Sequence, residues 1–230
     1  MVTARFAAEV SGPSIRPLGL FGGSFDPVHN AHLQLGRTAL ETLGLAAVHW
    51  LPNSVPGHRE GPRAAAADRL EMLKIALADE TRFAIDQTEL WQTEPSYSVD
   101  TLLRLRGQLG AQVPLVFIIG ADHLLGLHRW REWRKLLTLT HFAVAQRPGH
   151  EISESAMAPE VAAEYARRHA PLEAIGKHAA GSIVAFACAP MEISSTSIRA
   201  AIAAGKDVEK LLPAAVLAYI DANRLYGATT

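Results

Sequence analysis

Residues 18–33 read LGLFGGSFDPVHNAHL, and this stretch is the main indicator of the fold. It begins with a short apolar run of the kind found in buried strands. Two glycines, Gly22 and Gly23, follow the run and leave the backbone free to turn and to approach a ligand. Asp26-Pro27 then suits the entry to a helix. A strand, a glycine turn and a helix in this order are typical of a phosphate site.

His29 and His32 are one helical turn apart in this predicted helix. Both imidazole rings then lie on one face near the helix N-terminus, where free N–H groups and the positive end of the helix dipole favour an anion. Each ring can donate a hydrogen bond to a phosphate oxygen. Two alternatives stay open, namely ordinary structural histidines and two ligands of a zinc site. No nearby Cys, and no Glu placed as in the zinc-protease helix, completes such a metal site.

Composition narrows the class of protein. The chain has 230 residues, 49% of them hydrophobic, and can therefore bury a full core. Its formal charge of -1 gives no general attraction to nucleic acid or to an anionic membrane, so we expect neither as a partner. The single cysteine, Cys188, lies in the apolar run 183–189, is predicted to be a core residue and fits a reducing compartment. Because neither a membrane-spanning run nor a signal-peptide core is found, we expect a soluble, cytoplasmic protein.

Apolar strands and amphipathic helices alternate along the chain. After the opening strand, strands are predicted at 48–51, 83–86, 115–119, 142–145 and 183–189, and helices at 29–43, 68–78, 97–109 and in a Trp-rich stretch after Gly120-Ala121-Asp122. This alternation predicts an α/β fold with a doubly wound parallel sheet. The segments that follow the strands are expected to meet at the carboxyl edge of the sheet, where such folds bind ligands.

The domain organisation follows from the same pattern. Residues 1–16, broken by Gly12-Pro13, are predicted to form a flexible extension, and residues 17–230 a single domain. Residues 150–181 are rich in Glu, Ala, Arg and His and contain a helical run at 159–169. We interpret them as a helical connection or an insertion.

A second motif, MEISSTSIRAAI, occupies residues 191–202. Its hydroxyl groups are typical of a helix start, with Ser194 or Ser195 as the N-cap. An ordinary helix cap is one interpretation. Arg199, however, lies in the first turns of this helix, where its charge opposes the helix dipole and invites an anionic partner such as a triphosphate.

Together these segments resemble the nucleotidyltransferase superfamily of the His-x-Gly-His type, and within it the bacterial nicotinate-nucleotide adenylyltransferases. The resemblance spans residues 18–226. It rests on GGSFDPVHNAHL and ISSTSIR, which are similar to the two family signatures, and on PNSVPGHR, PSYSVDTL, FIIGADHLLGLHRW, QRPG and LLPAAVLAYI in the expected order. The family usually has Gly between the two histidines, whereas this chain has Ala31. The added methyl group is small and compatible with a helix, so we expect activity to be retained.

The resemblance implies a Rossmann-like nucleotidyltransferase fold and transfer of AMP from ATP to nicotinate mononucleotide, with release of pyrophosphate. It implies that His29, His32 and Arg199 are the catalytic residues, because this chemistry depends on positioning and on donors that stabilise charge. Mg²⁺ would be carried with ATP and needs no ligand from the protein. The implied ATP-binding residues are Gly22, Gly23, Ser24, Phe25, His29, His32, His58, Arg59, Gly120, Asp122, Ser194, Ser195, Thr196 and Arg199.

The pyridine nucleotide is implied to contact Asn53, Ser98 and Trp130. The indole of Trp130 suits stacking on a flat heteroaromatic ring, and the backbone amide of Ser98 would hold the nicotinate carboxylate. Asp122, if it does not serve as a helix cap, would accept hydrogen bonds from the adenosine ribose.

Several alternatives remain. A nicotinamide mononucleotide adenylyltransferase or another adenylyltransferase of the superfamily is the nearest, although chain length and Trp130 disfavour a phosphopantetheine enzyme. An inactive nucleotide-binding regulator and a fragment of a class I aminoacyl-tRNA synthetase are further ones. The synthetase should have a Lys-rich second signature, which ISSTSIR lacks. A homo-oligomer stays open.

Overall fold

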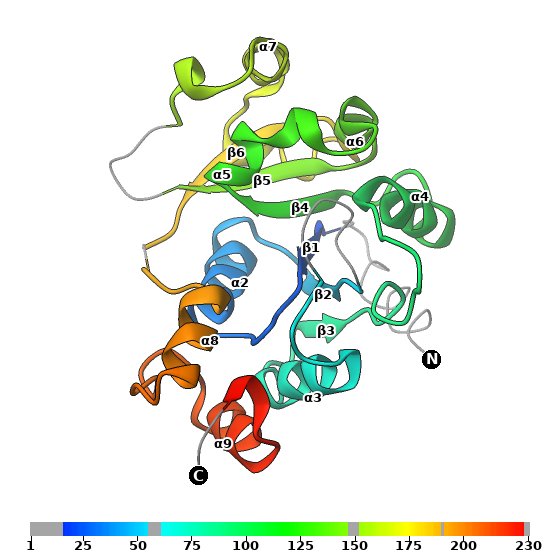
Figure 1. Cartoon of the computed structure of the whole chain (residues 1–230). Coiled ribbons are helices and arrows are strands. Elements are labelled where there is room, and N and C mark those ends of the chain that lie inside the picture. The colour runs from blue at the N-terminus through cyan, green and yellow to red at the C-terminus, as the bar shows by residue number, and fades with distance from the viewer. Residues whose placement is uncertain (1–15, 55–60, 147–151, 190, 228–230) are drawn as a thin grey trace.

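Six parallel strands form one sheet in the computed structural model, which describes residues 16–54, 61–146, 152–189 and 191–227 (Figure 1). The strands are β1 (Leu18–Gly23), β2 (Ala47–Pro52), β3 (Phe83–Ile85), β4 (Leu115–Gly120), β5 (His141–Gln146) and β6 (Ile183–Ala187). Their order in the sheet is β3-β2-β1-β4-β5-β6, and each neighbouring pair is parallel. The predicted α/β fold with a doubly wound parallel sheet is thus confirmed.

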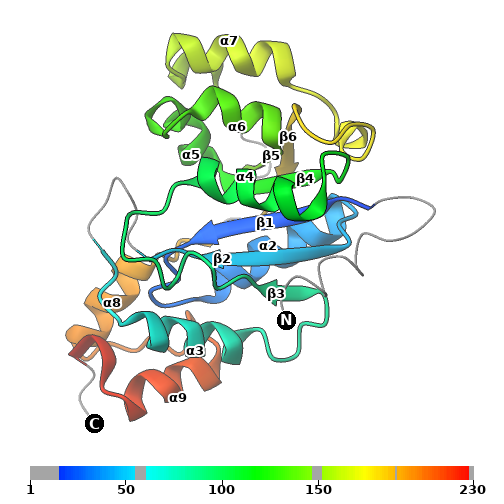
Figure 2. The same ribbon diagram turned by 90° about the vertical axis from the view of Figure 1, so that its right-hand side faces the viewer.

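Helices cover both faces of the sheet (Figure 2). One layer contains α2 (Asn30–Thr42), α3 (Ala66–Ala76), α8 (Ser195–Ala203) and α9 (Ala214–Ala222). The other contains α4 (Ser98–Leu109), α5 (Ala121–Leu125), α6 (Trp133–Leu139) and α7 (Pro159–Arg168). Short 3-10 turns complete the chain at η1 (Leu127–Arg129), η2 (Glu154–Ala156), η3 (Leu172–Ala174) and η4 (Leu225–Gly227).

Each helical layer packs on its own hydrophobic core. Along β2, Val48 and Trp50 belong to the core under α2, α3, α8 and α9, whereas Leu51 belongs to the core under α4 to α7. Strands that are buried on both faces must be apolar at nearly every position, which explains the continuous runs in the sequence. The helix α2 approaches the sheet closely at Gly36, because a Cβ atom there would lie 2.9 Å from Cζ2 of Trp50.

The strand order places a topological switch point between β1 and β4. The chain winds outward from β1 to β3 on one side of this point and from β4 to β6 on the other. The connections on the two sides lie on opposite faces, and in such folds ligands bind beyond the carboxyl ends of the strands at this point, here at Gly23 and Gly120. This edge of the sheet is where the candidate site is built.

The glycines of the opening motif act differently from the prediction. Gly22 and Gly23 are the last two residues of β1, and the turn comes after them. Gly23 is needed for space, because a Cβ atom there would lie 3.0 Å from Cζ of Phe25. The predicted helix at 29–43 is found as α2, with His29 as its N-cap, and Asp26-Pro27 lies in the loop that leads into it.

Other predictions concern the N-terminal extension, the Trp-rich stretch, the cysteine and membrane-spanning helices. Residues 1–15 of the predicted extension lie outside the described residues, and Arg16 donates a hydrogen bond to the carbonyl of Leu45 at 3.0 Å. The Trp-rich stretch is helical but divided into α5, η1 and α6. Cys188 is half-buried, packing beside the core without lying inside it, because β6 ends one residue earlier, at Ala187. Within the described ranges, helices that are long and apolar enough to cross a bilayer are absent.

Candidate active site at the switch point of the sheet

The loop between β1 and α2 is tightly folded. Phe25 adopts a left-handed backbone conformation with φ 48°, which is uncommon for a bulky residue, and its side chain is buried. Its ring makes edge contacts with Phe21 and His32, with centroid distances of 5.6 and 5.1 Å. Arg69, buried on α3, donates to the carbonyl oxygen of Ser24 at 2.7 Å. These contacts set the direction in which the chain enters α2.

The two histidines of the opening motif stack on each other. The ring centroids of His29 and His32 are 3.6 Å apart and the ring planes differ by 19°. The backbone N–H of His29 donates to Nδ1 of His32 at 3.3 Å. In a neutral His32 ring the proton must therefore be on Nε2, which makes this atom a hydrogen-bond donor. Nδ1 of His29 is buried and has no hydrogen-bond partner among the described residues.

Both imidazoles are uncharged at neutral pH. Burial lowers the pKa of His29 to about 4, and burial together with the adjacent His29 lowers the pKa of His32 well below its usual range. Protonating either ring would place a charge in a poorly solvated position next to another imidazole. The pair therefore offers neutral donors to an incoming ligand.

We expect this depressed pKa to make the stability of the protein pH-dependent. The folded chain keeps His29 neutral down to about pH 4, whereas an unfolded histidine takes up a proton near pH 6.5. The free energy of unfolding should thus fall as the pH is lowered from 6.5 towards 4. In urea titrations, the fall between pH 7 and pH 5 should be about 2 kcal/mol smaller for His29→Gln than for the wild type. Equal falls would contradict the depressed pKa.

The second motif docks directly onto the first. Ser194 is the N-cap of α8, and its Oγ accepts the backbone N–H of Ser197 at 3.1 Å. Oγ of Ser195 donates to the carbonyl oxygen of Pro27 at 3.0 Å. Nη1 of Arg199 donates to the carbonyl oxygen of Asp26 at 2.7 Å. The N-termini of α2 and α8 are therefore brought together at the segment immediately before His29.

Other predicted ATP-binding residues lie around this junction. Oγ1 of Thr196, on the exposed first turn of α8, accepts from Nη2 of Arg199 at 3.3 Å. Beyond β4, Gly120 is the N-cap of α5, so the exposed Asp122 is not that cap. His58 and Arg59 lie outside the described residues.

The three residues predicted for the pyridine nucleotide come from neighbouring segments. Ser98 is the first residue of α4, and Trp130 follows η1. These two segments meet where the guanidinium of Arg131 lies 4.8 Å from the ring centroid of Tyr97. Asn53 directly follows β2, and its buried Oδ1 has no hydrogen-bond partner among the described residues. Trp133 is a core residue.

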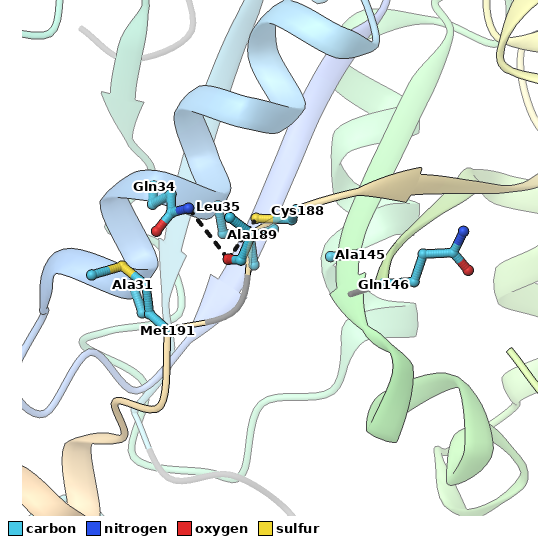
Figure 3. A pocket seen from close by; sticks show the side chains of 8 residues that line it. All are labelled: Ala31, Gln34, Leu35, Ala145, Gln146, Cys188, Ala189 and Met191. Carbon is cyan, nitrogen blue, oxygen red and sulfur yellow. Dashed lines mark hydrogen bonds between the residues drawn. The ribbon is translucent and has the colours of Figure 1, made fainter. Parts of the chain in front are cut away.

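A cavity of about 180 Å³ opens between α2 and the ends of β5 and β6 (Figure 3). Its wall consists of Ala31, Gln34, Leu35, Ala145, Gln146, Cys188, Ala189 and Met191. Nε2 of Gln34 donates to the carbonyl oxygen of Ala189 at 3.3 Å and joins the two sides. Ala31, the position that departs from the family pattern, is thus part of a cavity wall next to the histidine pair.

Sequence reasoning missed the buried residues that hold this site together. The carboxylate of Asp26 accepts the backbone N–H groups of Arg63 and Ala64, at 2.7 and 3.1 Å, and the hydroxyl of Tyr226 at 2.7 Å. Arg69 supports the loop between β1 and α2 through its hydrogen bond to the carbonyl oxygen of Ser24. Asp26 had been interpreted as a helix entry, and Arg69 and Tyr226 carried no signal because their partners are distant in sequence.

The described residues do not form a cluster of potential metal ligands. Across the part of the chain that the structure describes, three or more His, Cys, Asp or Glu side chains do not gather at any point. Among these described residues, the imidazoles of His29 and His32 form a pair without a third ligand.

Comparison with known proteins gives consistent results. The chain matches the cytidylyltransferase-like family over residues 20–201. It is 44% identical to a protein of Dechloromonas aromatica (strain RCB) named probable nicotinate-nucleotide adenylyltransferase, over 91% of this chain and 97% of that protein. A protein of the same name from Laribacter hongkongensis (strain HLHK9) is 45% identical over 91% and 94% of the two chains.

Solved structures extend the likeness to the fold. Plasmodium falciparum nicotinic acid mononucleotide adenylyltransferase complexed with NaAD superposes with a TM-score of 0.69 at 17% identity, covering 93% of this chain and 98% of that one. The complex of the same protein with APC gives a TM-score of 0.63 at 18% identity, with the same coverage. At these identities the comparison concerns the architecture of the sheet and helices.

Proposed function

Because this chain belongs to the nicotinate-nucleotide adenylyltransferase family, within the cytidylyltransferase-like group, we propose that it transfers AMP from ATP to nicotinate mononucleotide. The 5′-phosphate of the mononucleotide attacks the α-phosphate of ATP, and pyrophosphate leaves. The products are nicotinate adenine dinucleotide and pyrophosphate, and no covalent bond to the enzyme is formed.

The convergence of two helix N-termini supports this proposal most strongly. The hydrogen bonds from Ser195 to Pro27 and from Arg199 to Asp26 bring α8 against the start of α2. The positive ends of both helix dipoles then lie at one region, beside the cation of Arg199. Such a region suits a triphosphate better than any uncharged ligand.

The residues of this region would act mainly by binding and orienting phosphate oxygens. The transition state of nucleotidyl transfer spreads negative charge over the phosphate oxygens, and donors that are already in place stabilise it. Nε2 of His32 is such a donor, because Nδ1 accepts a hydrogen bond from the backbone. The attacking 5′-phosphate is already an anion and needs no base to remove a proton, so we assign the imidazoles to hydrogen bonding.

We propose that Mg²⁺ arrives with ATP and is held by the phosphate oxygens. Mg²⁺ generally keeps several waters and binds substrate phosphates in such sites. The described residues do not group into a set of metal ligands, and the carboxylate of Asp26 already accepts three hydrogen bonds. We therefore assign no resident metal ion to the protein.

The cavity at Ala31 is the proposed place of the adenine ring. Its wall includes Ala31, which lies between the two histidines in sequence, and is largely apolar, and the amide of Gln34 supplies a polar edge. For Ala31→Gly we expect a KM for ATP within threefold of the wild type and a loss of stability of up to about 1 kcal/mol, because glycine weakens a helix. Ala31→Leu should raise that KM by roughly tenfold or more by filling the cavity. Steady-state kinetics and thermal unfolding measure both, and a large gain in turnover for Ala31→Gly would contradict this assignment.

Trp130 is the proposed stacking partner of the pyridine ring. For Trp130→Ala we expect the KM for nicotinate mononucleotide to rise about tenfold, the range for one lost aromatic contact, while the KM for ATP stays unchanged. Trp91 provides a matched control, because it is the same residue type in another segment, before α4, and its side chain is 56% exposed. Initial rates with each substrate varied in turn separate the two constants. Similar effects of Trp130→Ala and Trp91→Ala would remove Trp130 from the site.

Release of pyrophosphate tests the proposed reaction. Purified protein with ATP and Mg²⁺ should release pyrophosphate with nicotinate mononucleotide, more slowly with nicotinamide mononucleotide, and not with phosphopantetheine. The dinucleotide product should appear in equal amount. Reaction with the nicotinamide form alone would overturn the substrate assignment, and no release with any acceptor would overturn the proposed activity.

A further inference from the structure

Tyr226 links the end of the described chain to the opening motif. Its hydroxyl donates to Oδ1 of Asp26 at 2.7 Å, across 200 residues of sequence. Burial and the bond to Asp26 both raise the pKa of Tyr226, so the phenol stays protonated and remains a donor. The backbone of Tyr226 is in the left-handed region with φ 60°, a conformation that persists only where surrounding contacts enforce it.

Both carboxylate oxygens of Asp26 accept hydrogen bonds. Oδ1 accepts from Tyr226 and from the backbone N–H of Ala64, and Oδ2 accepts from the backbone N–H of Arg63 at 2.7 Å. Nη1 of Arg199 instead bonds to the main-chain carbonyl of Asp26, at 2.7 Å, and lies 3.6 Å from Oδ2. Arg199 is thus close to the carboxylate without a short contact to it.

This arrangement decides whether the charged guanidinium of Arg199 is available to a ligand. A carboxylate that loses a donor becomes a stronger acceptor for the nearest cation. Arg199 is a cation close to Oδ2 of Asp26, and its side chain is 24% exposed, whereas Arg69 is buried and already bonded to Ser24. A tight ion pair with Asp26 would satisfy the guanidinium internally and weaken its attraction for phosphate.

We infer that Tyr226 is a positioning residue for Arg199: by holding the carboxylate of Asp26, its hydroxyl keeps the guanidinium available to the triphosphate of ATP. This inference rests on the proposed function. It concerns the ATP end of the site, because Tyr226 lies in η4, which packs against α8 and α9. The effect should therefore fall on one substrate.

The variant Tyr226→Phe removes only the hydroxyl and tests the inference. We expect its KM for ATP to rise roughly three- to tenfold, the effect of one lost hydrogen bond, with the KM for nicotinate mononucleotide within twofold of the wild type. Tyr219→Phe is the matched control. The hydroxyl of Tyr219, on α9, also donates to an aspartate, Oδ1 of Asp68 at 3.0 Å, but Asp68 lies on α3 and outside the β1–α2 loop that Arg199 contacts. Both variants should unfold at a lower temperature, and only Tyr226→Phe should change the KM for ATP.

A double-mutant cycle with Asp26→Asn separates this role from a loss of stability. Asparagine carries no charge that could capture Arg199, so adding Tyr226→Phe to Asp26→Asn should leave the KM for ATP unchanged within twofold. All variants are assayed at a temperature at which their unfolding curves show them folded. Equal KM values for wild type and Tyr226→Phe, or an undiminished effect in the Asp26→Asn background, would overturn the inference. A wild type that does not release pyrophosphate would instead refute the proposed function.

Discussion

Replacing His32 by alanine is expected to lower kcat by about a hundredfold or more, the cost of losing one donor that stabilises a transition state. Nε2 of His32 is the donor, because Nδ1 accepts the backbone N–H of His29. The ring is also held in place by stacking on His29 and by the edge contact with Phe25. A donor fixed in advance needs no reorganisation when charge develops on the phosphate. Pyrophosphate release at saturating substrates measures kcat.

The exposed His178 supplies the control for this substitution. Its side chain lies on the surface in the connection before β6, so His178→Ala should leave kcat unchanged. His32→Ala also removes an acceptor for the N–H of His29, and we expect it to unfold at a slightly lower temperature. If folded His32→Ala turned over within threefold of the wild type, His32 would not be a catalytic residue.

The second large effect is expected for Arg199→Ala, which should lower kcat/KM for ATP by about a hundred- to a thousandfold. This change removes the cation beside the two helix N-termini and the bond to the carbonyl of Asp26. Arg199→Lys should recover only part of the loss, because an ammonium group cannot bond to Asp26, Thr196 and a phosphate with the same geometry.

A variant of Lys206 tests whether a positive charge anywhere near α8 is enough to support ATP binding. It is exposed just beyond the opposite end of the helix. Lys206→Ala should change kcat/KM for ATP by less than twofold, with salt dependence similar to that of the wild type. A loss in Lys206→Ala comparable with that in Arg199→Ala would show a general electrostatic attraction in place of a specific contact.

The local part of this architecture could be predicted from the sequence. The strands are buried on both faces, so their apolar runs were long enough to identify, and Ser194 is a cap whose partner lies three residues away. The Gly22-Gly23 pair was misinterpreted because glycine allows either a turn or close packing. In the structure Gly23 allows close packing, because the ring of Phe25 lies against it.

Contacts between distant segments could not be predicted in this way. The bond from Tyr226 to Asp26 joins the two ends of the described chain, and no spacing or periodicity indicates it. The lowered pKa of His29 likewise depends on burial by other segments. The resemblance to a known family indicated that the two motifs belong to one site, but not which contacts bring them together.

The strand order has a further consequence for how the protein forms. The strands β1, β2 and β3 follow one another in sequence and in space, as do β4, β5 and β6, so each half of the sheet can assemble from nearby segments. Within the described sheet, the two halves are joined by the pairing of β1 with β4, in which Leu18 lies opposite Leu115. Outside the sheet, contacts such as the bond from Arg199 to Asp26 also join them. Contacts between such distant segments carry the largest loop-closure entropy and form late. Since the site spans this seam, we expect catalytic competence to be gained last during folding and lost first during unfolding.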